Sequence, residues 1–296
     1  MFGKRPDGRR VKGIDPVLRI TPYVMPLRCD AQVFLKHRAD LELLSSYIRA
    51  HKKQGEAFSA MQILVAAYVR AISTYPEANR YIMNKQLFAR NNCSVAFTIL
   101  QDPNDADKGE AVVKIKFDLT DTLFDVRDRM NAAIAANRGE AASEGFVSKL
   151  LNFLFAVPGL ATVVVALVRF LDRFGLAPSV LMEELPFYVG MYVTNMASIG
   201  LHEVNHHLYN WGNVSLFFGI GTPEKLAVQE NDETRMKRFL PIGITADERI
   251  CSGAYYARFF NAIKRYLNHP ELLEQPPESI HFDEGLEYHE PKPSAH

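Results

Sequence analysis

A run without any charged residue, residues 150–168, limits most strongly what this chain can fold into. About 20 apolar residues are enough to cross the core of a bilayer, so length alone permits a transmembrane helix. Pro158 and Gly159 interrupt the run near its middle, and Arg169 follows its end directly. Two short apolar helices joined at the Pro-Gly step fit the pattern at least as well. Such a pair would form a buried hairpin, a subunit contact, the wall of an acyl pocket, or a patch that docks on lipid or a partner.

Helix-like and strand-like segments follow one another in mixed order on both sides of this run. Apolar residues recur at intervals of three and four after Ser59, which predicts a buried helix with Ser59 as its N-cap and an end before Pro76. Two apolar runs, 94–100 and 111–117, flank a turn-rich segment and predict a hairpin with a long loop. Further strands are expected at 31–36, 187–196, 213–221 and 238–245, and a last helix at 253–268. This mixture predicts an α/β two-layer sandwich with a mixed sheet.

Charge and cysteine content argue against two classes of function. The chain has 34 basic and 34 acidic residues, so it lacks the excess positive charge that holds nucleic acid. Its cysteines, Cys29, Cys93 and Cys251, lie far apart and in no spacing typical of zinc ligands. They predict free thiols in a reducing compartment, here the cytoplasm, and no bound metal.

The two ends of the chain differ in composition from the rest. Residues 1–29 open with a basic stretch that no apolar stretch follows, so we expect a solvated arm and a first segment rather than a secretory signal. Residues 276–296 are rich in acidic residues and proline, which predicts a tail that is disordered or runs over the surface. Residues 30–275 are expected to form a single domain.

Four stretches carry a resemblance to a known family. They are "SAMQILVAAYVRAISTYPEANRYI", "YVTNMASIGL", "NVSLFFGIG" and "DERICSGAYYARFFNAIKRYLNHPELLE". In order and content they resemble the chloramphenicol acetyltransferase-like superfamily. The closer match is the catalytic domain of 2-oxo acid dehydrogenase acyltransferases, such as dihydrolipoamide acetyltransferase. The likeness covers residues 30–275 and implies the CoA-dependent acyltransferase fold, here with an apolar helical insertion around residues 146–185.

The resemblance also implies an activity and an assembly. Members of the family move an acyl group between coenzyme A and a thiol or hydroxyl acceptor, and they form trimers with the active site between subunits. We therefore expect a coenzyme A thioester as substrate, a homotrimer, and a small-molecule or lipoyl-type acceptor. No segment resembles a lipoyl domain, so another chain would supply a lipoyl carrier. Because the family fold keeps both halves of its sheet together, we do not expect residues 150–168 to span a membrane; peripheral lipid contact there is the weaker alternative to core or subunit contact.

The family motif Asp-His-Arg-x-x-Asp-Gly is only partly present. Glu248 stands where the family has its general-base histidine, and Ser252 stands where it has a structural aspartate, a position that also suits a helix N-cap. Thr194 falls near the hydroxyl that donates to the oxyanion in the family. An ordinary glutamate binds a proton more weakly than an ordinary histidine by about 3 kcal/mol, and burial in an apolar channel raises the pKa of a carboxyl group. Glu248 is therefore the candidate base, and the alternative is a catalytically degenerate trimer that binds or scaffolds.

The stretch "HEVNHH" offers a second candidate base. His202 and His206 are spaced i, i+4, as in zinc-binding helices, but no amphipathic pattern flanks them, so we expect no zinc site. His206 or His207 would replace the missing histidine if this loop turned toward the channel. Otherwise both are structural or surface histidines.

Overall fold

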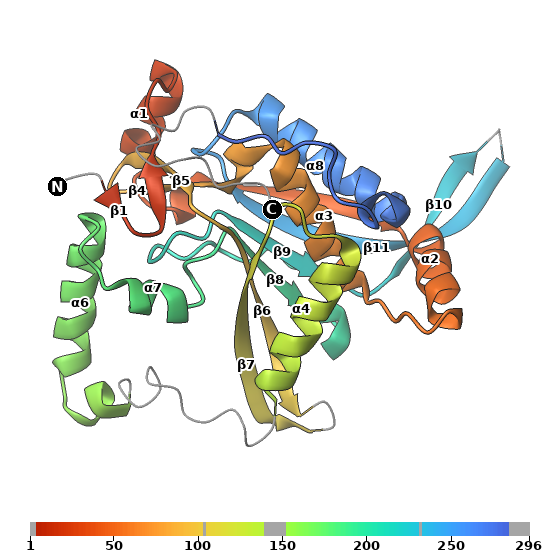
Figure 1. Cartoon of the computed structure of the whole chain (residues 1–296), viewed down its shortest axis with the longest axis horizontal. Coiled ribbons are helices and arrows are strands. Elements are labelled where there is room, and N and C mark those ends of the chain that lie inside the picture. The colour runs from red at the N-terminus through yellow and green to blue at the C-terminus, as the bar shows by residue number, and fades with distance from the viewer. Residues whose placement is uncertain (1–3, 103–104, 139–151, 231–232, 284–296) are drawn as a thin grey trace.

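One large sheet forms the centre of the computed structural model, which describes residues 4–102, 105–138, 152–230 and 233–283 (Figure 1). β6, β8 and β9 run parallel to one another, and the other neighbouring strands are antiparallel. The predicted mixed sheet is confirmed. Its spatial order is β10 (Glu224–Glu230), β11 (Glu233–Asp247), β9 (Leu216–Ile220), β8 (Met191–Asn195), β6 (Cys93–Asp102) and β7 (Asp105–Phe117), and β3 (Gln32–Asp40) also pairs with β11.

Helices form the second layer, on one face of this sheet. α3 and α8 lie side by side there, and α4 packs against α3 (Figure 1). The two-layer α/β sandwich expected from the sequence is therefore present. Its helices are α2 (Leu41–Lys53), α3 (Ala60–Thr74), α4 (Leu123–Ala136) and α8 (Gly253–Asn268).

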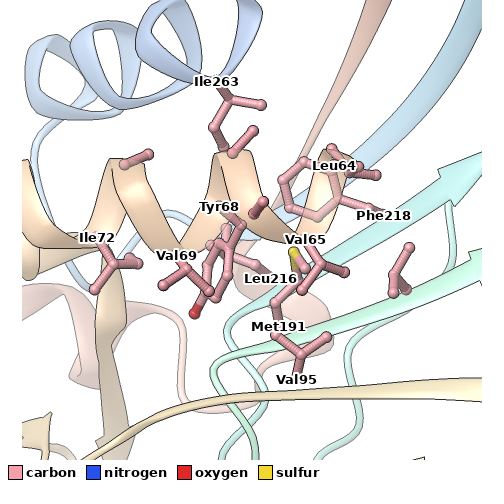
Figure 2. Packing of buried hydrophobic residues seen from close by; sticks show 14 of the residues in the cluster. Leu64, Val65, Tyr68, Val69, Ile72, Val95, Met191, Leu216, Phe218 and Ile263 are labelled. Atoms are coloured by element: carbon pink, nitrogen blue, oxygen red, sulfur yellow. The ribbon is translucent and has the colours of Figure 1, made fainter. Parts of the chain in front are cut away.

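The core is built around α3. The Ser59 side chain accepts a hydrogen bond from the Gln62 backbone at 3.2 Å, and the Gln62 side chain accepts one from the Ser59 backbone at 2.8 Å. This capping box confirms the predicted start of the helix. Figure 2 shows Val65 on the sheet side of α3, close to Met191 and Leu216 on the strands. Burying one such side chain contributes about 1.5–3 kcal/mol, so this contact between the layers stabilises the fold.

The opposite face of the sheet is covered by the segment between β8 and β9. At Gly219 and Gly243 this segment passes so close that an added Cβ would meet the carbonyl oxygen of Val204 at 2.6 Å. Next to them, Phe217 and Tyr192 belong to a small apolar cluster on the same face. Glycine at the two strand positions therefore lets the histidine-bearing segment lie flat on the sheet.

The N-terminal segment is not the solvated arm that its charge predicted. It joins a second, four-stranded sheet and then forms α1 (Pro16–Val24). Arg5 is buried in this region and pairs with Asp172 at 2.7 Å and with Asp7 at 2.9 Å. A buried cation needs an anion beside it, and Asp172 supplies one from the body. The strands of this sheet are β1 (Lys4–Arg5), β2 (Gly8–Arg10), β5 (Gln86–Arg90) and β4 (Arg80–Met83). The segment also joins the body through the antiparallel pairing of β2 with β5.

The predicted hairpin of β6 and β7 is present, but its long loop is not. The two strands continue until Asp102 pairs with Asp105. Continued pairing satisfies backbone N–H and C=O groups that a loop would leave to water. Of the predicted C-terminal tail, residues 284–296 lie outside the described residues.

The apolar run forms two helices joined at Pro158 and Gly159, one of the two alternatives that its pattern left open. Residues 152–156 are helical, and Gly159, at φ 81°, precedes α6 (Leu160–Arg173). Residues 150 and 151 of the run lie outside the described residues. In the part of the chain that the structure describes, no helix combines the length and the apolar character that crossing a bilayer requires.

The described part of this pair is not a buried hairpin within one chain. α6 lies at the side of the molecule, away from the main sheet, and α7 (Ser179–Glu184) follows it (Figure 1). On α6, Val163, Leu167 and Phe170 are 66%, 54% and 57% exposed. Their spacing of four and three residues places them in one stripe along the helix. An apolar stripe of this kind indicates a contact surface rather than a core element.

Candidate active site

The turn after β11 is held in shape by buried charges. Asp247 has no exposed surface, and its carboxylate accepts two hydrogen bonds from Arg249, at 2.8 Å from Nε and 2.7 Å from a terminal nitrogen. Arg28 brings a second guanidinium to 3.6 Å from the same carboxylate. Arg249 also donates to the carbonyl oxygen of Met25 at 2.8 Å. The two charged residues that agree with the family motif therefore fix the turn.

Glu248 lies between these buried residues, and its side chain is exposed. Its backbone N–H donates to the carbonyl oxygen of Ala31 at 3.0 Å, which ties the turn to the start of β3. Arg249 pairs with Asp247 and is not the partner of Glu248. A glutamate base would need desolvation to gain strength, and a single chain does not supply it.

Ser252 begins α8. Its hydroxyl accepts a hydrogen bond from the backbone N–H of Tyr255 at 3.3 Å. The N-cap function predicted from the sequence is confirmed. An aspartate at this position would cap the helix equally well, so the local fold survives the departure from the family motif.

Glu248 and Ser252 both line an open groove of about 780 Å³. α1, β3 and α8 form its walls, and the apolar side chains that line it include Leu35 and Tyr256. It follows β3 from the turn at Glu248 to His37, and the six strand residues from Gln32 to His37 span about 20 Å. The groove is therefore long and largely apolar, with a carboxylate near one end.

Thr194 lies away from this groove, on β8. It is half-buried, and its hydroxyl contacts the sulfur of Met196 at 3.6 Å. Strand register places it beside Gly219, and Gly219 beside Gly243, five residues before Glu248. Five strand residues span about 17 Å, so a single chain does not bring Thr194 and Glu248 together. A site that contains both needs two copies of the chain.

Comparison with known proteins points to one family for the part of the chain that carries this turn. A family model described as 2-oxoacid dehydrogenases acyltransferase (catalytic domain) matches residues 189–274. The dihydrolipoyllysine-residue acetyltransferase component of the pyruvate dehydrogenase complex of Rickettsia typhi is 27% identical over 84 residues. That stretch is 28% of this chain and only 20% of the relative.

Solved structures extend the likeness over most of the chain. A probable dihydrolipoamide acetyltransferase from Listeria monocytogenes matches with a TM-score of 0.56 at 13% identity, over 86% of this chain and 93% of that one. The cubic core of a pyruvate dehydrogenase multienzyme complex matches with a TM-score of 0.56 at 14% identity, over 87% and 88%. The chain has the acyltransferase catalytic-domain fold. The resemblance inferred from the sequence motifs is confirmed, and β8, β9, β11 and α8 of this acyltransferase fold lie within the matched residues.

The other candidate bases do not line the groove. His206 and His207 lie on the opposite face of the sheet, in a segment without helix or strand. His206 stacks on Phe217 with ring centroids 4.4 Å apart, and burial, with a further contribution from His207, lowers the pKa of His206. The exposed His207 packs edge-on against Tyr209. Within a single chain, both histidines are therefore structural or surface residues.

The structure adds one groove residue that sequence reasoning missed, His37. The predicted strand ended at residue 36, whereas β3 continues to Asp40 and turns Val33, Leu35 and His37 toward the groove. Burial, together with the charge of Lys264, lowers the pKa of His37 to about 4. The imidazole is therefore neutral at physiological pH. Extending the predicted strand by one residue would have continued the alternation of Val33 and Leu35 to His37.

No metal centre accompanies the groove in the described residues. Within these ranges, no three side chains of histidine, cysteine, aspartate or glutamate gather closely enough to hold an ion. The cysteines are free, with Cys29 exposed and Cys93 and Cys251 buried.

Proposed function

We propose that this protein is a CoA-dependent acyltransferase that moves an acyl group from a coenzyme A thioester to a thiol or hydroxyl acceptor. One observation carries the proposal: Glu248, at the position of the family's base, lines a long apolar groove on a chain with the acyltransferase fold. An extended, largely apolar substrate arm fits such a groove. The curated relatives are acetyltransferases that act on a dihydrolipoyl group, which supports a lipoyl-type thiol as one acceptor.

The proposed reaction uses Glu248 as general base. Its carboxylate takes the proton of the acceptor thiol or hydroxyl, and the resulting nucleophile attacks the thioester carbon. The Thr194 hydroxyl donates a hydrogen bond to the oxyanion that forms. When the intermediate collapses, the bond between the acyl carbon and the coenzyme A sulfur breaks. The proton held by Glu248 then passes to the departing thiolate.

The proposed assembly is a homotrimer in the cytoplasm, with each site shared between two copies. Thr194 and Glu248 lie too far apart in one chain, and a neighbour's β8 end placed over the groove would bring them together. The same neighbour would exclude water from Glu248, which is what the base requires. The apolar stripe of α6 is a further candidate contact between copies, with peripheral lipid contact as the weaker alternative.

A catalytically degenerate trimer is the second candidate, and the exposure of Glu248 favours it. The two candidates differ in turnover. The decisive assay follows free coenzyme A by chromatography after mixing the protein with dihydrolipoamide and acetyl-CoA or longer acyl-CoAs. Glu248→Gln should lower kcat by about a hundredfold or more, the range expected for loss of a general base. Glu278→Gln, at an exposed position outside the groove, is the matched control and should leave turnover unchanged.

Two results would decide against the leading proposal. Absence of turnover by the wild type with every acyl donor and acceptor would favour the degenerate trimer. Turnover that persists in Glu248→Gln would show that another group serves as base.

A further inference from the structure

A second hollow, on the other side of α1, is lined by positive charge. It measures about 180 Å³ and lies between β2, α1 and the turn that joins β4 to β5. Arg10, Lys12, Arg19 and Lys85 line it, and the described lining includes no acidic residue. Such a concentration of cations stands out in a chain whose 34 basic and 34 acidic residues balance.

The cations surround a fixed apolar floor. Val11 and Leu87, which form it, are 4% and 5% exposed, and the backbone N–H of Val11 donates to the carbonyl oxygen of Leu87 at 2.9 Å. The Lys85 ammonium lies 4.7 Å from the centre of the Tyr23 ring. In the part of the chain that the structure describes, the guanidinium groups of Arg10 and Arg19 have no carboxylate partner. Arg10 and Arg19 thus give the hollow positive charge that no carboxylate of the described residues neutralises.

Lys85 occupies a backbone position that lysine does not favour. Met83 pairs with Gln86, and the two residues between them, Asn84 and Lys85, have φ values of 49° and 60°. This is a two-residue hairpin turn in which both central residues are left-handed, and glycine is strongly preferred at the second. A lysine there carries a Cβ that crowds the backbone. A residue kept in an unfavourable conformation points to a function, here an ammonium group held at the edge of the hollow.

From this geometry we propose that the hollow binds the phosphate group of a small phosphorylated molecule, as a phosphomonoester or a diphosphate. Arginine and lysine are the side chains that bind phosphate, through charge-assisted hydrogen bonds. The hollow is small, so it holds the phosphate group while the remainder of the molecule lies outside. Leu18 lines both this hollow and the groove of Glu248, so only α1 separates the two. The phosphate therefore comes either from coenzyme A or from an unrelated phosphorylated metabolite, and the site does not depend on acyl transfer.

The Lys85→Gly variant tests the proposal, because it separates binding from folding. Glycine suits the turn, so the variant should melt at the same temperature as the wild type or higher. Titration calorimetry with pyrophosphate at low salt should nevertheless show binding weakened about tenfold or more, the loss expected for one charge-assisted contact. Lys225→Gln removes one positive charge from β10, on the opposite side of the molecule, and should bind pyrophosphate as the wild type does (Figure 1).

Two further arms identify the source of the phosphate. If coenzyme A competes with pyrophosphate, and its own binding weakens in Lys85→Gly, the phosphate belongs to coenzyme A, and dephospho-coenzyme A then shows whether the 3′-phosphate is the group held. If pyrophosphate binds and coenzyme A does not compete, the ligand is a separate metabolite. The proposal is overturned if the wild type binds no pyrophosphate, or if Lys85→Gly binds it as tightly as Lys225→Gln does. Because binding is measured without turnover, these outcomes are independent of the proposed acyl transfer.

Discussion

Replacing Asp247 by asparagine should destabilise the protein more than any change at a surface ion pair. Asp247 is fully buried and neutralises two guanidinium groups, of which Arg249 and Arg28 expose only 2% and 4% of their side chains. Burial already lowers the pKa of Arg28 to about 10, although Asp247 acts in the opposite direction. Asp247→Asn keeps the shape of the side chain and leaves two buried cations close together without their anion.

The size of the effect follows from this geometry. Removing one partner of a buried ion pair costs about 3–5 kcal/mol, and a carboxylate shared by two arginines belongs in the upper part of that range. Urea unfolding at fixed protein concentration measures the loss of stability. Urea is uncharged and leaves the charges unscreened, whereas guanidinium, a salt, would screen them. Glu224→Gln is the control: it removes a carboxylate 2.6 Å from the partly exposed Arg38 and should cost less than about 1 kcal/mol.

A double variant separates lost charge from lost packing. Asp247→Asn combined with Arg249→Met removes one of the stranded cations, so part of the stability should return. The argument fails if Asp247→Asn costs no more than Glu224→Gln, or if the double variant is no more stable than Asp247→Asn alone. Either result would mean that the buried charges do not hold the turn.

Three other predictions concern the groove and the surface. In the folded state the pKa of His37 is lowered from 6.5 to about 4, so as pH falls the unfolded chain binds a proton at His37 before the folded chain does. The free energy of unfolding should therefore fall as pH drops from 6.5 to 4. His37→Asn should flatten this fall in unfolding curves recorded across that range. Ser252→Ala should lower the free energy of unfolding in urea by about 1 kcal/mol through loss of the N-cap, whereas Ser252→Asp should lower it by almost nothing. If the two variants lose equal stability, the capping argument is refuted. Leu167→Glu combined with Phe170→Glu places charge in the apolar stripe of α6 and should shift the proposed trimer toward monomers in analytical ultracentrifugation. A trimer that forms unchanged in this variant would exclude α6 from the contact between copies.

Much of the fold was predictable because its signals are local. α3 and α8 follow from apolar spacing, and Ser59 and Ser252 mark their starts by bonds to residues three positions away. The motif around Asp247 and Gly253 pointed to the same family as the model that matches residues 189–274, although its histidine and its second aspartate are absent. Helix positions and helix starts of this kind depend on residues that are close in the sequence, so sequence patterns predict them.

The features that the sequence did not predict depend on distant partners. The N-terminal strands meet the body where Arg5 pairs with Asp172 and β2 pairs with β5, both partners lying far along the chain. α6 exposes its apolar stripe because of how it is placed beside the body, which periodicity alone does not reveal. The separation of Thr194 from Glu248 follows from the register of three strands, and a motif search treats both residues as one site. Tertiary placement decides each of these cases.

Mixing two inactive variants tests most directly whether Glu248 and Thr194 of neighbouring copies form one site. Glu248→Ala and Thr194→Ala chains, each inactive alone, would be unfolded together, refolded as mixed trimers and assayed for release of free coenzyme A. A site shared between copies predicts that activity returns to about a quarter of the wild-type level, because random mixing at equal amounts leaves that fraction of sites intact. Mixed trimers that stay as inactive as their parents, formed under conditions that restore a refolded wild type, would contradict the shared site.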